Sequence, residues 1–163
     1  MNKVGDTLLH LGANEEIVQA FTSSGVEFVI VGGLAVSWYC PDRQADDMDI
    51  LVNPTSDNSA RISQALSSLP SMPFRCFARN SFTKPGLQVP MKKFYHAELL
   101  TPRKDDPTFS DVSEDAVDAK LFGIPVRLAS IRRLMRMKEQ AVAAAEEQRE
   151  KHLADIVRLS HAV

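Results

Sequence analysis

The chain has 163 residues, of which 44% are hydrophobic and 25% are charged, and its formal net charge is −2. This balance excludes a strongly basic nucleic-acid-binding protein, and the length allows a hydrophobic core without disulfides or a structural metal. We therefore expect a single domain over residues 1–163, with a core over about 14–128 and C-terminal helices over about 131–162.

Cysteine content and hydropathy indicate the compartment. Cys40 and Cys76 are too few for a disulfide framework and form no CxxC pair, so we expect buried thiols in a reducing environment. The N-terminus lacks the basic flank and apolar run of a signal peptide, and no segment has the length of a transmembrane helix. These features predict a cytoplasmic protein with no membrane partner.

The first part of the chain predicts alternating helices and strands. Apolar residues recur at helical spacing before Gly25, a typical helix C-cap, and the β-branched run VEFVIV is typical of a buried strand. The expected elements are a helix over 14–25, a strand over 26–33, a helix over 34–40, a strand over 47–53 and a helix over 55–69.

The second part begins with residues 71–93, whose three prolines and one glycine indicate loops and strand fragments. The later elements are expected to be a strand over 94–101, an exposed loop over 103–116, two short strands around Gly123, a helix over 131–148 capped by Ser130, and a helix over 150–161. This order predicts an α+β domain, in which a mixed sheet has flanking helices and a helical C-terminus.

Two segments of opposite charge occur in this nearly neutral chain. Residues 42–49 hold four aspartates and one arginine, whereas residues 120–138 hold six basic residues and no acid. The two clusters could together bind a metal–phosphate ligand, or they could be two solvated faces. Within the basic segment, Arg132, Arg133 and Arg136 could contact an RNA or protein substrate, or could simply be solvated.

Asp47 and Asp49 open a predicted strand. Alternate strand residues share a face and each residue advances the chain by roughly 3.3 Å, so their Cα atoms lie roughly 7 Å apart on one face. Two carboxylates at that distance can converge on one hard cation through oxygen ligands, and they would repel each other without it. The alternative is a pair of solvated or turn-capping carboxylates.

A glycine pair precedes these aspartates. Gly32 and Gly33 follow the buried strand and precede a helix, where glycine lets the backbone approach a ligand and the helix N-terminus offers N–H groups to phosphate. Taken alone, the pair could make only a tight turn. Together with the Asp-x-Asp pattern it predicts a phosphate cradle beside a divalent metal, as transfer of a nucleotidyl group requires.

The segment VGGLAVSWYCPDRQADDMDILV, residues 31–52, resembles the signature of the nucleotidyltransferase superfamily related to DNA polymerase β. In the small bacterial members, a Gly-Gly strand end precedes the frame Arg-x-Thr-x-Asp-x-Asp. The positions of this frame are filled here by Arg43, Ala45, Asp47 and Asp49. Ala45 replaces the threonine, so any hydroxyl contact made there is lost, while both aspartates that the superfamily uses to bind metal are present.

The resemblance also implies a third carboxylate from a later strand. Glu98, in the predicted strand FYHAELLT, lies where the superfamily commonly has an Asp. A charge inside an apolar strand is costly unless it is paired or metal-bound, whereas on an edge strand it would be solvated. Period-two alternation places Phe94, His96, Glu98 and Leu100 on one face, and His96 is expected to be structural.

The C-terminal segments FGIPVRLASIRRLMRMKEQA and REKHLADIVRL are similar to the tail of small stand-alone nucleotidyltransferases, including abortive-infection-type toxins of toxin–antitoxin systems. The frame of that tail is filled by Gly123, Ser130, Leu134, Met135, Lys138, Lys151 and Asp155, whereas His152 departs from it. Lys138 lies on the apolar stripe of its helix, where it could reach a triphosphate or extend to solvent. Asp155 could help to bind the nucleotide, or it could form a surface ion pair with Lys151.

The resemblance implies a metal-dependent nucleotidyltransferase that binds an NTP such as ATP and moves its NMP to a hydroxyl, with Mg²⁺ or Mn²⁺ as cofactor. The expected catalytic and metal-binding residues are Asp47, Asp49 and Glu98. The expected nucleotide-binding residues are Gly32, Gly33, Ser37, Arg43, Lys138 and Asp155. The acceptor stays open between tRNA or protein, as for a toxin with an antitoxin partner, and a small molecule such as an antibiotic. A non-catalytic module that binds a nucleotide or a partner is a third alternative.

Overall fold

Helices and strands follow one another largely in the predicted order. The computed structural model describes residues 11–70, 77–91, 95–144 and 149–162. The elements up to residue 70 are α1 (Leu11–Ser23), β1 (Phe28–Val31), α2 (Gly32–Tyr39), β2 (Met48–Val52) and α3 (Ser56–Ser67). The later elements are β3 (Gln88–Pro90), β4 (Ala97–Leu100), α5 (Phe109–Glu114), β5 (Val117–Leu121), β6 (Ile124–Leu128), α6 (Ile131–Ala144) and α7 (Arg149–Ala162).

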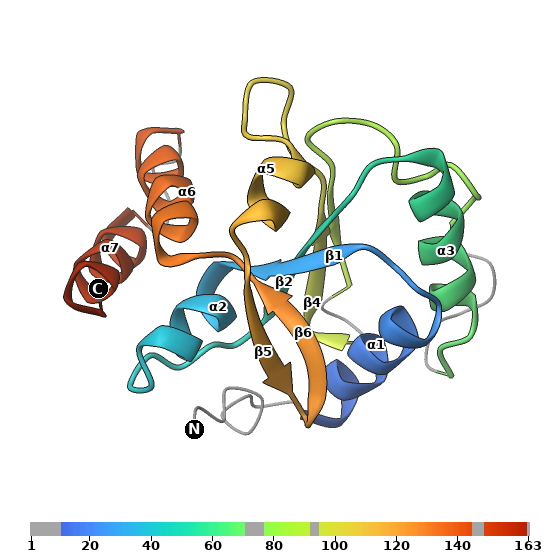
Figure 1. Cartoon of the computed structure of the whole chain (residues 1–163), viewed down its shortest axis with the longest axis horizontal. Coiled ribbons are helices and arrows are strands. Elements are labelled where there is room, and N and C mark those ends of the chain that lie inside the picture. Colours follow the sequence, from blue (N-terminus) through green and yellow to red (C-terminus); the bar gives the residue numbers. More distant parts are fainter. Residues whose placement is uncertain (1–10, 71–76, 92–94, 145–148, 163) are drawn as a thin grey trace.

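Within the described residues, the strands form a six-stranded mixed sheet in the order β3-β4-β2-β1-β6-β5 (Figure 1). β1 runs antiparallel to β2 and parallel to β6, while β2 runs parallel to β4. Because β2 lies between β1 and β4, residues at its start are flanked by both neighbours. The register pairs Asp49 with Val31 on one side and with Glu98 on the other. The α+β fold class predicted from the sequence is confirmed.

The two faces of the sheet are used differently. In β4, Ala97 and Leu99 are buried, whereas Glu98 and Leu100 on the opposite face are only half-buried. Figure 1 shows α1 and α3 together on one side of the strands, and α2, α6 and α7 gathered on the other. Among the described residues, no helix is long and apolar enough to cross a membrane.

The exposed loop predicted over 103–116 is wrong in its second half, which forms α5. Thr108 is the N-cap of this helix, and it forms a capping box with Asp111: each side chain hydrogen-bonds the other residue's backbone N–H. Phe109 and Val112 are buried and attach this short helix to the core. A helix of six residues shows too little periodicity to be recognised between so many acidic residues.

The strand predicted over 94–101 begins only at Ala97. His96 has φ +49°, in the left-handed region, so it does not share the strand face of Glu98 as the alternation suggested. β4 is also an interior strand, since β3 pairs with it, and the edge-strand alternative for Glu98 is therefore wrong. Two positions singled out from the sequence, Cys76 and Phe94, lie outside the described residues.

Asn58 joins α3 to the two strands that lead to the site. Its Oδ1 accepts a hydrogen bond from the Glu27 N–H at 2.7 Å. Its Nδ2 donates to Glu27 O at 3.0 Å and to Asn53 O at 2.9 Å. Since the side chain is fully buried, these bonds fix the distance between the start of β1 and the end of β2.

We expect Asn58→Ala to lower the free energy of unfolding by about 2–4 kcal/mol, because three hydrogen bonds are lost and their buried backbone partners stay unsatisfied. Urea unfolding followed by circular dichroism measures this change. Ser67→Ala is the control, since Ser67 is exposed and its hydroxyl donates to Ser63 O within its own helix. A loss no larger for Asn58→Ala than for Ser67→Ala would contradict this role.

Candidate functional site

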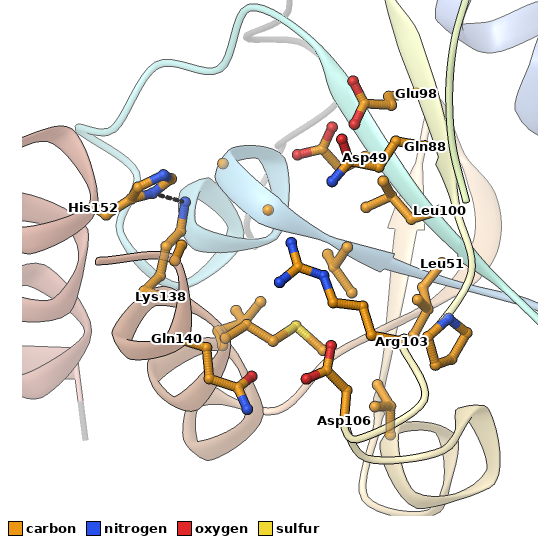
Figure 2. A pocket seen from close by; sticks show the side chains of 18 of the residues that line it. Asp49, Leu51, Gln88, Glu98, Leu100, Arg103, Asp106, Lys138, Gln140 and His152 are labelled. Carbon is orange, nitrogen blue, oxygen red and sulfur yellow. Dashed lines mark hydrogen bonds between the residues drawn. The ribbon is translucent and has the colours of Figure 1, made fainter. Parts of the chain in front are cut away.

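A pocket of about 640 Å³ lies between the half-buried face of the sheet and helices α5, α6 and α7. Its floor comes from the ends of β1, β2 and β4, and its rim includes residues 101–103 and 106–107 that follow β4. Figure 2 shows side chains from these elements converging on one space. Seven of the predicted site residues line it: Gly32, Gly33, Arg43, Asp47, Asp49, Glu98 and Lys138.

The turn from β1 into α2 is built around Gly32, which has φ +72°. A Cβ on Gly32 would lie 2.9 Å from the Asp49 Cβ and closer still to its Oδ2. Only glycine therefore fits between this turn and the Asp49 carboxylate. The first N–H groups of α2 have no partner within the helix, and they lie at the turn that lines the pocket. An anionic group can therefore approach the backbone here, directly beside a carboxylate.

The acidic side of the pocket is formed by Asp47, Asp49 and Glu98, all of them half-buried. Asp49 and Glu98 are register partners on neighbouring parallel strands, and Figure 2 shows their carboxylates close together. Asp47 precedes β2, and its Oδ1 lies 4.0 Å from the Nδ1 of His96. The buried neighbours Met48 and Ile50 anchor the strand, so alternation directs these acids towards the pocket.

These side chains fit a hard divalent cation by their chemistry. Among the residues that the structure describes, no group of three or more His, Cys, Asp or Glu side chains is gathered as a metal site. Mg²⁺, however, usually keeps several waters and is held by one or two carboxylates together with phosphate oxygens of the substrate. Asp47 and Asp49 supply such carboxylates at the pocket, and Glu98 supplies a neighbouring one.

The basic side of the pocket begins with Arg43, which is 7% exposed. Its Nε donates to the Asp155 Oδ1 at 2.8 Å, and its Nη1 donates to Gln44 O. A Cβ on Gly33 would lie 2.8 Å from the Arg43 Nη2. The second glycine is therefore the residue that lets a buried guanidinium lie against the turn.

Asp155 is fully buried and is contacted by three cations. The Arg43 Nε lies 2.8 Å from its Oδ1, the Lys138 Nζ 3.1 Å from its Oδ2, and the Arg158 Nη1 3.4 Å from its Oδ1. Burial would raise the pKa of Asp155, but the Arg43 hydrogen bond and the Lys138 charge outweigh it and lower the pKa. The surface pair with Lys151 that the sequence allowed is wrong, because Asp155 has no exposed surface.

The cluster of Arg43, Lys138, Asp155 and Arg158 retains a net positive charge. Arg158 also lies 4.0 Å from Asp42, an exposed residue, so three cations face two carboxylates. Lys138 is only 8% exposed, so the alternative that it extends to solvent is wrong. Lys138 and Arg43 both line the pocket, which gives this side of it an unbalanced positive charge.

Ser37 and Asp155, two of the predicted nucleotide-binding residues, are not among the described residues that line the pocket. The Ser37 Oγ lies 3.0 Å from Gly33 O and 2.5 Å from Arg43 O, so its hydroxyl joins α2 to the loop before β2. Both residues lie behind those that line the pocket, where they can position the turn and Arg43. Ala45, which replaces the threonine of the frame, is buried and lines the pocket.

Sequence reasoning missed several polar residues of the pocket. Figure 2 shows Arg103 extending its guanidinium into the space, with Gln88 and Gln140 also at the lining. None of the three could be recognised from its neighbours in the sequence, since Gln88 and Arg103 come from segments assigned to loops and strand fragments and Gln140 from the middle of a predicted helix. The role of the arginines on α6 was left open by the sequence. In the structure, Arg132 and Arg133 form ion pairs with Asp115, at 2.9 and 3.4 Å.

Comparison with known proteins identifies the fold. No protein-family model and no curated protein sequence matches the chain. A crystal structure of an antigenic nucleotidyltransferase-like protein from Paracoccidioides brasiliensis is similar, with a TM-score of 0.58 and 20% identity over 91% of this chain and 73% of the other. ANT(2")-Ia in complex with adenylyl-2"-tobramycin is similar too, with a TM-score of 0.56 and 13% identity over 91% of this chain and 86% of the other.

These similarities show that the chain has a nucleotidyltransferase-like fold. The resemblance to the nucleotidyltransferase superfamily inferred from the glycine pair and the Asp-x-Asp frame is thereby confirmed at the level of the fold. At such low identity the comparison carries no residue roles or activity over to this chain.

Gly32→Ala should lower thermal stability and the binding of an anionic ligand at the turn. The added Cβ would collide with Asp49, and alanine is also strained at the positive φ of this position. Gly123→Ala is the matched control: Gly123 also has positive φ, but no atom lies within 4 Å of an added Cβ. We expect Gly32→Ala to cost about 2 kcal/mol more than the control. Equal melting temperatures for the two variants would show that the contact with Asp49 is unimportant.

Asp155→Asn should destabilise the fold by about 3–5 kcal/mol, since it leaves buried cations without their counter-ion. The pKa of Asp155 is lowered from its ordinary 3.8, so its stabilising effect is complete above about pH 4 and is lost as the pH falls further. Wild-type stability should therefore fall more steeply than that of the variant below pH 4. Chemical denaturation at several pH values measures both effects, with Asp118→Asn, an exposed residue, as the control.

Proposed function

We propose that this protein is a metal-dependent nucleotidyltransferase, which moves an NMP from an NTP to a hydroxyl acceptor. One observation carries the proposal. A single pocket joins a glycine turn at the N-terminus of α2, a set of carboxylates at the start of β2 and in β4, and a positively charged wall. A nucleoside triphosphate with a divalent cation has the complementary charges. Of the two similar structures, one is named a nucleotidyltransferase-like protein and the other holds adenylyl-2"-tobramycin.

The roles of the residues follow from their positions. Asp47 and Asp49 would hold Mg²⁺ or Mn²⁺, with Glu98 as a further carboxylate, and the bound metal would supply charge neutralisation at the phosphates. The N–H groups at the Gly32–Gly33 turn would receive phosphate oxygens. Arg43 and Lys138 would offset the negative charge of the leaving pyrophosphate.

Glu98 is the carboxylate best suited to assist the acceptor. It is the register partner of Asp49 and lies on β4, the strand whose continuation supplies part of the pocket rim. In the proposed reaction the acceptor oxygen attacks the α-phosphorus, the bond from that phosphorus to the bridging oxygen breaks, and pyrophosphate leaves. The hydroxyl proton would pass to the Glu98 carboxylate and then to solvent. The rate enhancement would come mainly from positioning and charge stabilisation.

The proposal has two versions, which differ in the molecule that accepts the NMP. A toxin-like enzyme would modify tRNA or a protein hydroxyl and could have an antitoxin partner, as the similarity of the C-terminal segments suggests. A small-molecule acceptor is favoured by one observation: a similar fold is that of ANT(2")-Ia, whose structure contains adenylyl-2"-tobramycin. The pocket volume lies within the range of small-molecule sites, which is compatible with either acceptor because the nucleotide would occupy part of it.

The test incubates the purified protein with each α-labelled NTP, Mg²⁺ and three acceptors in turn: bulk tRNA, cell protein and an aminoglycoside panel. Transfer of label to one of them, with release of pyrophosphate, is expected. Asp49→Asn should reduce the rate at least about 100-fold, because a carboxylate that holds the metal is removed. Omission of the metal or addition of EDTA should have the same effect.

Asp118→Asn is the matched control, since Asp118 is exposed on β5 and pairs with Arg127 across the hairpin. Its rate should equal that of the wild type. An unchanged rate in Asp49→Asn would disprove the assignment of the metal site. Binding of NTP without any pyrophosphate release would favour the non-catalytic module, and no binding of any NTP would reject the proposal.

A further inference from the structure

His152 lies at the pocket, although the C-terminal frame seen in the sequence gave it no role. It is half-buried on α7 and lines the pocket beside Lys138 and Lys151. Its Nδ1 lies 3.3 Å from the Lys138 Nζ, and Figure 2 shows this contact as a hydrogen bond. Among the described residues, it is the one hydrogen bond of the His152 ring.

This contact determines which ring nitrogen carries the proton. A lysine ammonium has three donors and no acceptor, so a hydrogen bond with it requires an unprotonated Nδ1. The same Nζ also forms an ion pair with Asp155, whose Oδ2 lies 3.1 Å away. A neutral imidazole that accepts at Nδ1 must carry its hydrogen at Nε2. His152 is therefore a hydrogen-bond donor at its other nitrogen.

A protonated His152 would be poorly tolerated here. Its neighbours on the other elements are Lys138 of α6 and Arg43 of the loop before β2, with Asp155 and Lys151 on its own helix. Burial lowers the pKa of His152 and the Lys138 charge lowers it further, and together they outweigh the Asp155 charge, which acts in the opposite direction. The neutral, Nε2-protonated form is thus the one that both the hydrogen bond and the surrounding charges favour.

We propose that Lys138 holds His152 in the Nε2–H form, and that His152 donates from Nε2 to an anionic oxygen of the ligand in this pocket. The ligand class is a polyphosphate, because His152 stands at the cationic side of the pocket and not with the carboxylates. The identification of that polyphosphate as part of an NTP rests on the proposed function. In this role His152 recognises the ligand and does not act as a general base, since its lone pair is already used by Lys138.

The first experiment determines the tautomer in the ligand-free protein. The ¹⁵N–¹H spectrum of the imidazole side chains, assigned by its difference from that of His152→Gln, should show the His152 hydrogen on Nε2 at pH 7.5. A hydrogen on Nδ1, or a doubly protonated ring at that pH, would overturn the proposal. This measurement is independent of any enzymatic activity.

The second experiment measures binding of tripolyphosphate, and of each NTP with Mg²⁺, by calorimetry at pH 7.5. His152→Ala should weaken tripolyphosphate binding about tenfold, as expected for a lost hydrogen bond to a charged group. His152→Gln should stay within about twofold of the wild type, since its amide nitrogen can replace Nε2–H as donor. His152→Asn, whose amide is too short to reach the position of Nε2, should resemble the alanine variant.

The three variants also separate recognition from a structural role. If His152 only supported α7, then Ala, Asn and Gln would change the melting temperature together and rescue by Gln would be absent. Equal tripolyphosphate binding by wild type and His152→Ala would overturn the inference. If wild type bound tripolyphosphate through His152 but no NTP, the inference would stand and the proposed function would fail. If it bound neither, both would fail.

Discussion

The buried carboxylate of Asp155 is the point on which the candidate site depends. It joins α7, where it also contacts Arg158, to Arg43 before β2 and to Lys138 on α6. Burying so many charges is costly, and an apolar cluster of equal volume would often be at least as stable. The arrangement is therefore poorly explained by stability alone. It does fix two cations at the lining of a pocket and leaves their charge only partly balanced.

A second constraint is steric, and it connects the same cluster to the acidic side of the pocket. Gly32 leaves room for the Asp49 carboxylate, and Gly33 leaves room for the Arg43 guanidinium. The turn is thus held between an anion and a cation, one from the neighbouring strand and the other from the buried cluster. The Ser37 hydroxyl adds hydrogen-bond contacts with the backbone carbonyls of Gly33 and Arg43. Arg43 contacts both Asp155 of α7 and the Gly33 side of this turn. A displacement of α7 would therefore also displace the turn that lies against the Asp49 carboxylate.

The parts of the site that could be predicted from the sequence are those encoded by short segments. Gly32 and Gly33 at a strand-to-helix turn, and the alternation of Asp47 and Asp49 with buried residues, are local patterns with a local physical cause. The resemblance then supplied Glu98, which the register of β4 brings beside Asp49. Local patterns failed where a structure is short or irregular, as in α5 and at His96.

The sequence by itself determined the α+β class, the order of most elements and the position of the glycine turn and its aspartates, since period and turn chemistry act over a few residues. Only the tertiary structure decided that Asp155 is buried rather than a partner of Lys151, that Lys138 meets His152, and that Arg103 reaches into the pocket. These contacts join α7, α6 and the segment after β4, which are separate in the chain. Their geometry depends on how the helices pack against the sheet, and no spacing within one segment encodes that packing.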